Sequence, residues 1–318
     1  MKKLAMMIVS LLAAGMCAAA CAEEGEVKAY LGESFAWQNA QEVDPKRPEQ
    51  LPVYAAPSED AWRGANGRAA VSLTEPLAVL GVVEDSDWLL IEYEISATER
   101  RIGYICSNEH WSPWVSTLSL AGIVAHTSGE TVMTDDPRAS GRAMAVLPGN
   151  KLVCVLGGVG EDLFYVEATI DGKTAYGFVP SSAVALPEMT PQTDVTERLE
   201  GVWGFSGGAE VLGYGAIFTA DGSLLLCDTD DGMETPPTRL IPDADRPATY
   251  AVYRTDAEDR RFWSEYVVTL EVDGSRQVYG LSFYPGEDGE PEHIHIEAGP
   301  SGGFYTRYET PPELIDGD

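Results

Sequence analysis

Cysteine and histidine are scarce in this chain of 318 residues, which contains 5 Cys and 4 His. Beyond the N-terminal segment only Cys106, Cys154 and Cys227 remain, spread singly along the chain. An odd, scattered set of this kind does not indicate a disulfide framework. We expect buried thiols at these positions, and a bridge between Cys106 and Cys154 is the alternative.

Basic residues are also few. Lys and Arg number 21 against 51 Asp and Glu, the net charge is −30, and no Lys occurs beyond Lys173. A surface of this sign repels nucleic-acid phosphates and anionic lipids, so neither is an expected partner. It also disfavours direct contact with anionic wall polymers unless divalent cations bridge the two. The simplest role of the charge is solubility outside the cell.

Long apolar runs are missing except at the N-terminus. Two Lys precede an apolar stretch at 4–16 and then small residues, which is typical of a secretory signal peptide over residues 1–22. The run is too short for a stable transmembrane span. Simple cleavage is one alternative, and lipidation of Cys21 as the new N-terminus is the other. Both place the mature chain outside the cytoplasm, beginning with a polar leader segment at 23–50.

One stretch of the sequence occurs twice, at 78–105 and at 153–179. Matching pairs are Leu80-Gly81 with Leu156-Gly157, Ile91-Glu92 with Val166-Glu167, and Gly103-Tyr104-Ile105 with Gly177-Phe178-Val179. Each copy has short strands rich in aromatic and β-branched residues with turn signals between them, which predicts a small antiparallel barrel. A period of about 75 residues is too long for a solenoid unit, so we expect two domains in tandem.

The order of these strands resembles bacterial Src-homology-3-like (SH3-like) domains. The strands that begin at Trp88 and Leu163 and the two Gly-aromatic closing strands carry the resemblance. It implies SH3-like domain 1 over residues 51–110 and SH3-like domain 2 over residues 118–187, each a barrel of five to six strands. It further implies contact with cell-wall peptide or with another envelope protein.

Three tryptophans are the candidate ligand contacts of these domains. Trp62 lies in an excursion at 58–68 that lengthens the first copy, and Trp111 and Trp114 lie in the connector between the copies. Exposed indole rings stack on sugars and peptides, but they also pack the junctions between domains. Both roles stay open for the pair in the connector.

A Pro- and Thr-containing linker at 187–195 leads to a segment of different composition at 196–310, without Lys and with many strand and turn signals. The expected strands are Val202–Ser206, Gly213–Thr219, Ser223–Cys227, Thr249–Arg254, Glu265–Val272, Gln277–Tyr284, His293–Ala298 and Gly303–Tyr308. Eight successive strands with tight turns predict a closed antiparallel barrel, because closure removes exposed edges. An open sandwich is the alternative.

The two ends of this segment resemble lipocalin-like proteins. A strand that begins with Gly-x-Trp, with the Trp at Trp203, opens it, and the last strand contains Arg307. The resemblance implies that Arg307 packs over the Trp203 ring at the floor of the barrel, a cation–π contact worth about 0.5–2 kcal/mol. An eight-stranded barrel either fills itself with side chains or holds a small ligand, here an apolar one.

The sharpest polar pattern is the run HIHIE at 293–297. On a strand, alternation places His293, His295 and Glu297 on one face and the two Ile side chains on the other. Two imidazoles and a carboxylate are a candidate metal set. The simpler interpretation is an outer strand face above inward-pointing Ile. The acidic loop at 228–232 lacks the remaining ligands of a calcium loop.

No constellation in the sequence carries a reaction. Nucleophilic catalysis needs a Cys or Ser beside a His, and Cys227 ends a strand with no helical pattern after it. The abundant carboxylates select no pair for glycoside cleavage. We therefore expect three separately closed β-modules that form a non-enzymatic binding or adaptor protein without a cofactor. A structural spacer without a small ligand, or a metal-dependent activity at His293 and His295, are the alternatives.

Overall fold

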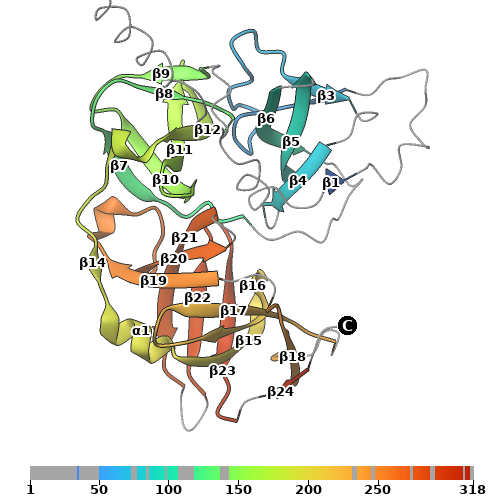
Figure 1. Ribbon diagram of the computed structural model, residues 1–318, viewed down its shortest axis with the longest axis vertical. Helices are drawn as coiled ribbons and strands as arrows, with labels where there is room; N and C mark the ends of the chain where they lie inside the picture. The colour runs from blue at the N-terminus through green and yellow to red at the C-terminus, as the bar shows by residue number, and fades with distance from the viewer. Residues whose placement is uncertain are drawn as a thin grey trace, which may run out of the picture.

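The computed structural model of the chain is built almost entirely from β-strands, with 57% strand and 6% helix (Figure 1). It describes residues 34–35, 50–72, 77–83, 86–96, 99–106, 118–136, 143–230, 235–244, 248–272, 275–286, 291–310 and 312–315. The signal peptide, Cys21, Trp111 and Trp114 lie outside these residues. Within them, no helix has the length and apolar character needed to cross a membrane. The predicted all-β class is confirmed.

A closed antiparallel barrel of eight strands forms the lower half of the molecule in Figure 1. Its strands are β15 (Gly201–Gly208), β16 (Val211–Phe218), β17 (Ser223–Asp228), β19 (Ala248–Arg254), β20 (Tyr266–Val272), β21 (Ser275–Tyr284), β22 (His293–Glu297) and β23 (Gly302–Arg307). Neighbours in this order pair with each other, and β23 returns to β15 to close the ring. The barrel predicted for residues 196–310 is confirmed, and the open sandwich is excluded.

Side chains that alternate along the barrel strands form one buried hydrophobic cluster. On β22, for example, Ile294 and Ile296 are buried in this cluster. Tyr305 is fully buried, yet its hydroxyl is satisfied. It accepts the Leu212 N–H at 2.6 Å and donates to the Gly213 carbonyl at 3.2 Å. The polar atom of this buried ring therefore costs little, because it has both partners.

Short elements flank the barrel. Helix α1 (Thr193–Leu199) precedes β15, and its buried Val195 and Leu199 join the hydrophobic cluster of the barrel. Strand β14 (Thr190–Pro191) pairs with β19, and β18 (Arg239–Pro242) pairs with both β17 and β24 (Glu313–Leu314). The linker predicted at 187–195 is therefore attached to the barrel through β14 and α1.

Both copies of the repeated stretch fold into the same set of strands. The first has β4 (Leu77–Val82), β5 (Trp88–Ser96) and β6 (Glu99–Cys106), and the second has β10 (Leu152–Val159), β11 (Leu163–Ile170) and β12 (Lys173–Pro180). A hairpin precedes each set, β2 (Gln50–Pro52) with β3 (Ala70–Ser72), and β8 (Thr131–Met133) with β9 (Ala145–Leu147). An added strand completes each sheet, β1 (Ser34–Phe35) on β4 and β7 (Ile123–Thr127) on β10.

The glycines shared by the two copies occupy matching places. A β-bulge interrupts the register at Gly81 in β4 and at Gly157 in β10. The closing glycines lie against the end of the first strand of the hairpin. A Cβ on Gly103 would lie 2.5 Å from the Val53 side chain, and a Cβ on Gly177 would lie 2.8 Å from the Met133 side chain. The closing glycine therefore occurs in both copies because a larger residue would collide with the neighbouring strand.

The second repeat and the barrel share one sheet. Strand β10 pairs with β7 through residues 152–155 and then, beyond its bulge, with β21 through residues 157–159. A single sheet of 16 strands results. The expectation of three separately closed modules is wrong at this junction, because the same edge of β10 pairs first with a strand of the second repeat and then, beyond the bulge, with a strand of the barrel.

The connector at 118–122 ties all three parts together. Leu118 packs on the bare backbone of Gly81 in the first repeat. The Ser119 N–H donates to the Gln277 side-chain carbonyl of the barrel at 2.9 Å. The end of the connector packs with buried residues on the outside of the barrel. The three parts are consequently held in a fixed arrangement.

Candidate functional site

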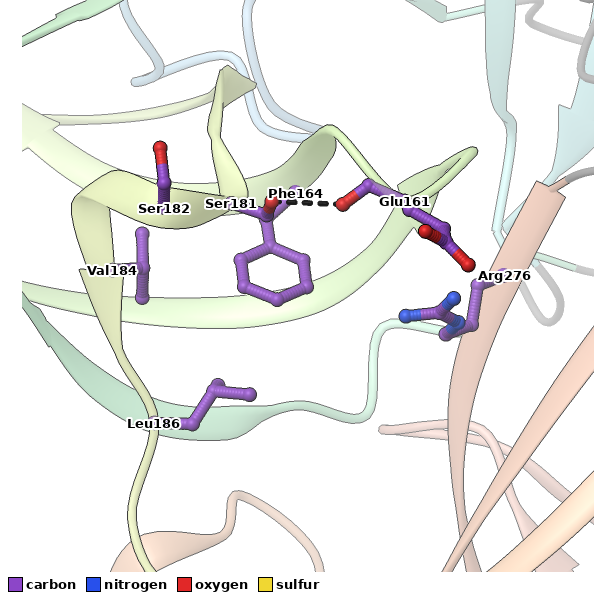
Figure 2. A pocket seen from close by; sticks show the side chains of 7 residues that line it. All are labelled: Glu161, Phe164, Ser181, Ser182, Val184, Leu186 and Arg276. Atoms are coloured by element: carbon purple, nitrogen blue, oxygen red, sulfur yellow. Dashed lines mark hydrogen bonds between the residues drawn. The ribbon is translucent and has the colours of Figure 1, made fainter.

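An open groove of about 500 Å³ lies where the second repeat meets the barrel (Figure 2). Residues of three segments line it: Glu161 and Phe164 around the β10–β11 turn, Ser181, Ser182, Val184 and Leu186 after β12, and Arg276 near the start of β21. These segments are far apart in the sequence. Arg276 joins the groove because β21 pairs with β10.

Two glycines of β10 allow the sides of the groove to approach. Gly158 pairs with Arg276 across the junction. A Cβ on Gly157 would lie 2.2 Å from the Arg276 carbonyl oxygen, and a Cβ on Gly158 would lie 2.6 Å from the Leu163 carbonyl oxygen. With no side chains there, the Arg276 guanidinium stands beside the turn that carries Glu161, as Figure 2 shows.

The groove has a charged side and an apolar side. In Figure 2, Glu161 and Arg276 lie at one side and Val184 and Leu186 at the other, with Phe164 between them. Leu186 is 42% exposed, so its apolar surface faces solvent. This combination suits an extended peptide, which presents apolar side chains together with carboxylate or amino groups.

Hydrogen bonds fix the rim of the groove. The Ser181 hydroxyl donates to the Glu161 carbonyl at 2.8 Å, which ties the short helix η2 (Ser181–Ala183) to the β10–β11 turn. Arg276 Nη2 donates to Glu271 Oε2 at 3.3 Å. A guanidinium has five N–H donors, so this bond leaves Arg276 capacity for a further acceptor.

Trp62 lies in the junction between the two repeats. The backbone N–H of Trp62 donates to the Thr174 carbonyl at 3.0 Å, and its half-buried ring packs against the core of the second repeat. The Tyr176 N–H donates to the Ala55 carbonyl at 2.7 Å beside it. The excursion at 58–68 thus lies along β12, and the Trp62 ring contributes to this junction.

The three cysteines of the described chain are not joined by disulfides. The alternative bridge between Cys106 and Cys154 is therefore wrong. Burial raises the pKa of Cys154 to about 12 and that of Cys227 to about 12. Both side chains remain protonated thiols at neutral pH, which is unsuited to nucleophilic chemistry.

Arg307 and Trp203 meet at one end of the barrel. The guanidinium carbon lies 5.3 Å from the centre of the indole ring, which is fully buried. Trp203 Nε1 donates to the Leu199 carbonyl of α1 at 2.8 Å. Arg307 also donates to the Glu200 carbonyl and, at 3.3 Å, to Glu292. The pair therefore joins α1 to the first and last strands.

The three polar residues of β22 lie on its outer face, and each has a different environment. His293 Nδ1 forms a hydrogen bond of 2.8 Å with the Thr306 hydroxyl, and the His295 ring stacks on Phe304 with centroids 4.5 Å apart. Among the described residues, no group of three or more His, Cys, Asp or Glu is placed to hold a metal ion.

Glu297 accepts hydrogen bonds from the loop that precedes β20. Glu297 is only 7% exposed, and its carboxylate accepts the backbone N–H groups of Trp263 and Ser264, both at 3.0 Å. The Ser264 hydroxyl donates to it at 2.8 Å. This carboxylate is thus a structural acceptor for three donors.

Sequence reasoning missed both the groove and Trp263, whose side chain is 95% exposed. Trp263 follows a buried Phe262, and no pattern distinguishes the two neighbouring aromatic residues. The groove needs the pairing of β10 with β21, which has no short-range signal.

Comparison of the chain with models of protein families, with curated protein sequences and with solved structures finds no match.

Proposed function

We propose that this chain is a secreted or surface-anchored, non-enzymatic adaptor of the bacterial cell envelope. The signal-like N-terminus and the resemblance of both repeats to SH3-like domains support the location and the adaptor role. The matching strand pairing of the two repeats is consistent with that resemblance. The observation that carries the proposal is the groove between the second repeat and the barrel.

The ligand of the groove is an extended peptide, either cell-wall peptide or a segment of an envelope protein. Arg276 is placed to bind a carboxylate, and Glu161 is placed to bind an amino group. Phe164 and Leu186 provide apolar contact between the two ends of the peptide. An open groove gives modest affinity, which suits an adaptor that exchanges partners.

Fixed geometry supports this role. The groove lies at a junction where backbone strands pair and where the connector at 118–122 anchors the first repeat as well. A preformed groove loses little conformational entropy on binding.

Binding to soluble wall peptides and to purified cell wall tests the proposal. We expect Arg276→Gln to weaken binding of the peptides in isothermal titration by about tenfold, because a charge-assisted hydrogen bond is lost. Arg254→Gln is the matched control, since Arg254 is 60% exposed on the barrel and pairs with Glu265. Wild-type protein that binds neither material, with or without calcium, would refute the wall proposal. Equal affinity of the two variants would refute the groove as the site.

A rigid spacer without a small ligand is the second candidate, and the barrel interior favours it. The described interior residues form one continuous buried cluster that includes Trp203, Phe218 and Tyr305. The Arg307–Trp203 contact and the eight-stranded ring support a lipocalin-like assignment without implying a ligand. Stoichiometric uptake of a fluorescent fatty acid would contradict the spacer and favour an apolar-ligand role.

A further inference from the structure

Trp263 is presented to solvent by a rigid loop. The loop is closed by Arg260, whose Nη1 donates to the Glu265 carbonyl at 2.6 Å. On either side of Trp263, the side chains of Phe262 and Ser264 are buried. The Glu297 carboxylate holds the backbone of the loop from inside. The backbone that carries this large apolar ring is thus fixed, while the ring itself is 95% exposed.

More aromatic rings lie on the same outer side of the barrel. Phe304 of β23 is 42% exposed and stacks on His295, its partner across the β22–β23 ladder. Tyr284 of β21 is 47% exposed, and its ring centroid lies 6.1 Å from that of Phe304. We call Trp263, Tyr284, His295 and Phe304 the aromatic face.

A glycine, Gly302, lies on the barrel surface between the Trp263 loop and the other rings. Gly302 lies opposite Glu297 in the β22–β23 ladder. A Cβ on Gly302 would lie 2.3 Å from His295 Nε2, so the imidazole leans over Gly302 toward the end of β22 where Glu297 holds the Trp263 loop. The surface between Trp263 and the Phe304–His295 stack therefore has no side chain rising from Gly302.

None of the four residues of the aromatic face is charged, although the chain has a net charge of −30. The nearby Glu265, whose backbone N–H donates to Ser282 opposite His295, forms an ion pair with Arg254. Burial lowers the pKa of His295, and this effect exceeds the opposite one of Glu297, so the imidazole is neutral at pH 7. The Glu297 carboxylate is enclosed by its donors and does not face solvent. A ligand on this face meets rings, an imidazole nitrogen and a phenolic hydroxyl.

We propose that the aromatic face binds an uncharged glycan. A sugar ring has an apolar face that packs on an indole or phenyl ring, and its hydroxyls match the polar edges of His295 and Tyr284. A protein partner would require a continuous apolar patch around Trp263, whereas here Tyr284 and Phe304 are less than half exposed and alternate with polar groups. A neutral ligand is also not repelled by the acidic chain.

This site is separate from the groove. Arg276 and Tyr284 lie at opposite ends of β21, about 27 Å apart along an extended strand. The two sites share no residue, so failure of one proposal leaves the other unaffected.

Affinity electrophoresis tests the proposal. Full-length protein is run in native gels that contain a neutral β-glucan, α-glucan, mannan or galactan, at low and high salt. We expect at least one polysaccharide to slow the wild-type protein independently of salt, and Trp263→Ala to raise its dissociation constant about tenfold. Leu152→Ala is the control, because Leu152 is 51% exposed on β10, away from the aromatic face.

Folding is checked by the thermal midpoint, which Trp263→Ala leaves unchanged because the side chain makes no buried contact. A second readout is the intrinsic fluorescence, which sugar binding shifts in the wild type and not in the variant. Absence of retardation by every polysaccharide, or equal retardation of the variant, overturns the proposal. Self-association through Trp263, seen as loss of a dimer in the variant, overturns it in favour of a protein interface.

Discussion

A single buried carboxylate determines how the most exposed indole of the described chain is displayed. Glu297 lies under the loop that carries Trp263 and accepts hydrogen bonds from two backbone N–H groups and one hydroxyl. Burying an ion is costly unless its lone pairs are satisfied, and these donors satisfy them. The exposed indole and the carboxylate that holds its loop are therefore 34 residues apart in sequence.

Replacing Glu297 with Ala leaves two N–H donors without an acceptor at a buried site. We expect the free energy of unfolding to fall by about 3 kcal/mol, since bonds to a charged acceptor are lost. Urea unfolding followed by fluorescence measures the change. Glu265→Ala is the control, and its exposed pair with Arg254 should contribute less than about 1 kcal/mol. Equal losses in the two variants would show that the Glu297 contacts are unimportant.

Among the strands, β10 differs most from its sibling β4 in what it contacts. Both strands bulge at the shared glycine. At Gly81 the space receives the Leu118 side chain, whereas at Gly157 it receives the backbone of β21. The glycine at the bulge therefore allows a close contact in both copies, but with a different part of the molecule in each.

Gly157→Val tests the role of this bulge. The added Cβ would lie 2.2 Å from the Arg276 carbonyl oxygen, so β10 and β21 must separate. We expect loss of amide hydrogen-exchange protection at Ser275 and Gln277 and a destabilisation of about 3 kcal/mol. Gly129→Val is the matched control, because a Cβ there meets no atom within 4 Å. Retained protection at β21 would contradict the proposed pairing.

The strands of the barrel could be predicted from the sequence because each carries its own signals. Turns such as Asp221-Gly222 separate them, and alternation along β22 placed Ile294 and Ile296 inside. The pairing of β10 with β21 could not be predicted, because it joins residues far apart without any periodic pattern. Trp263 gave no signal either, since its exposure depends on a buried Glu297 that the sequence places on an outer strand face.

At the scale of the whole molecule, the parts are joined through their cores. Buried residues of both repeats form one hydrophobic cluster, in which the hydroxyls of Tyr104 and Tyr165 lie 3.2 Å apart. Arg101 of the first repeat forms an ion pair of 2.9 Å with Asp135 of the second. Shared cores of this kind couple the stabilities of the parts.

We therefore expect the chain to unfold in one cooperative transition. Fluorescence, far-ultraviolet circular dichroism and calorimetry should give the same thermal midpoint. Two separate transitions, one for the repeats and one for the barrel, would contradict the coupling through the connector at 118–122 and the shared sheet.

The excursion that carries Trp62 also affects how copies of the molecule meet. The 16-stranded sheet ends at β12, and backbone groups of Ala55 and Trp62 are hydrogen-bonded along that strand. An uncovered terminal strand offers a template on which a neighbouring molecule can add its own strand. The segment at 55–62 of the first copy thus occupies part of the edge of the second, and we expect its removal to expose that edge to pairing between molecules.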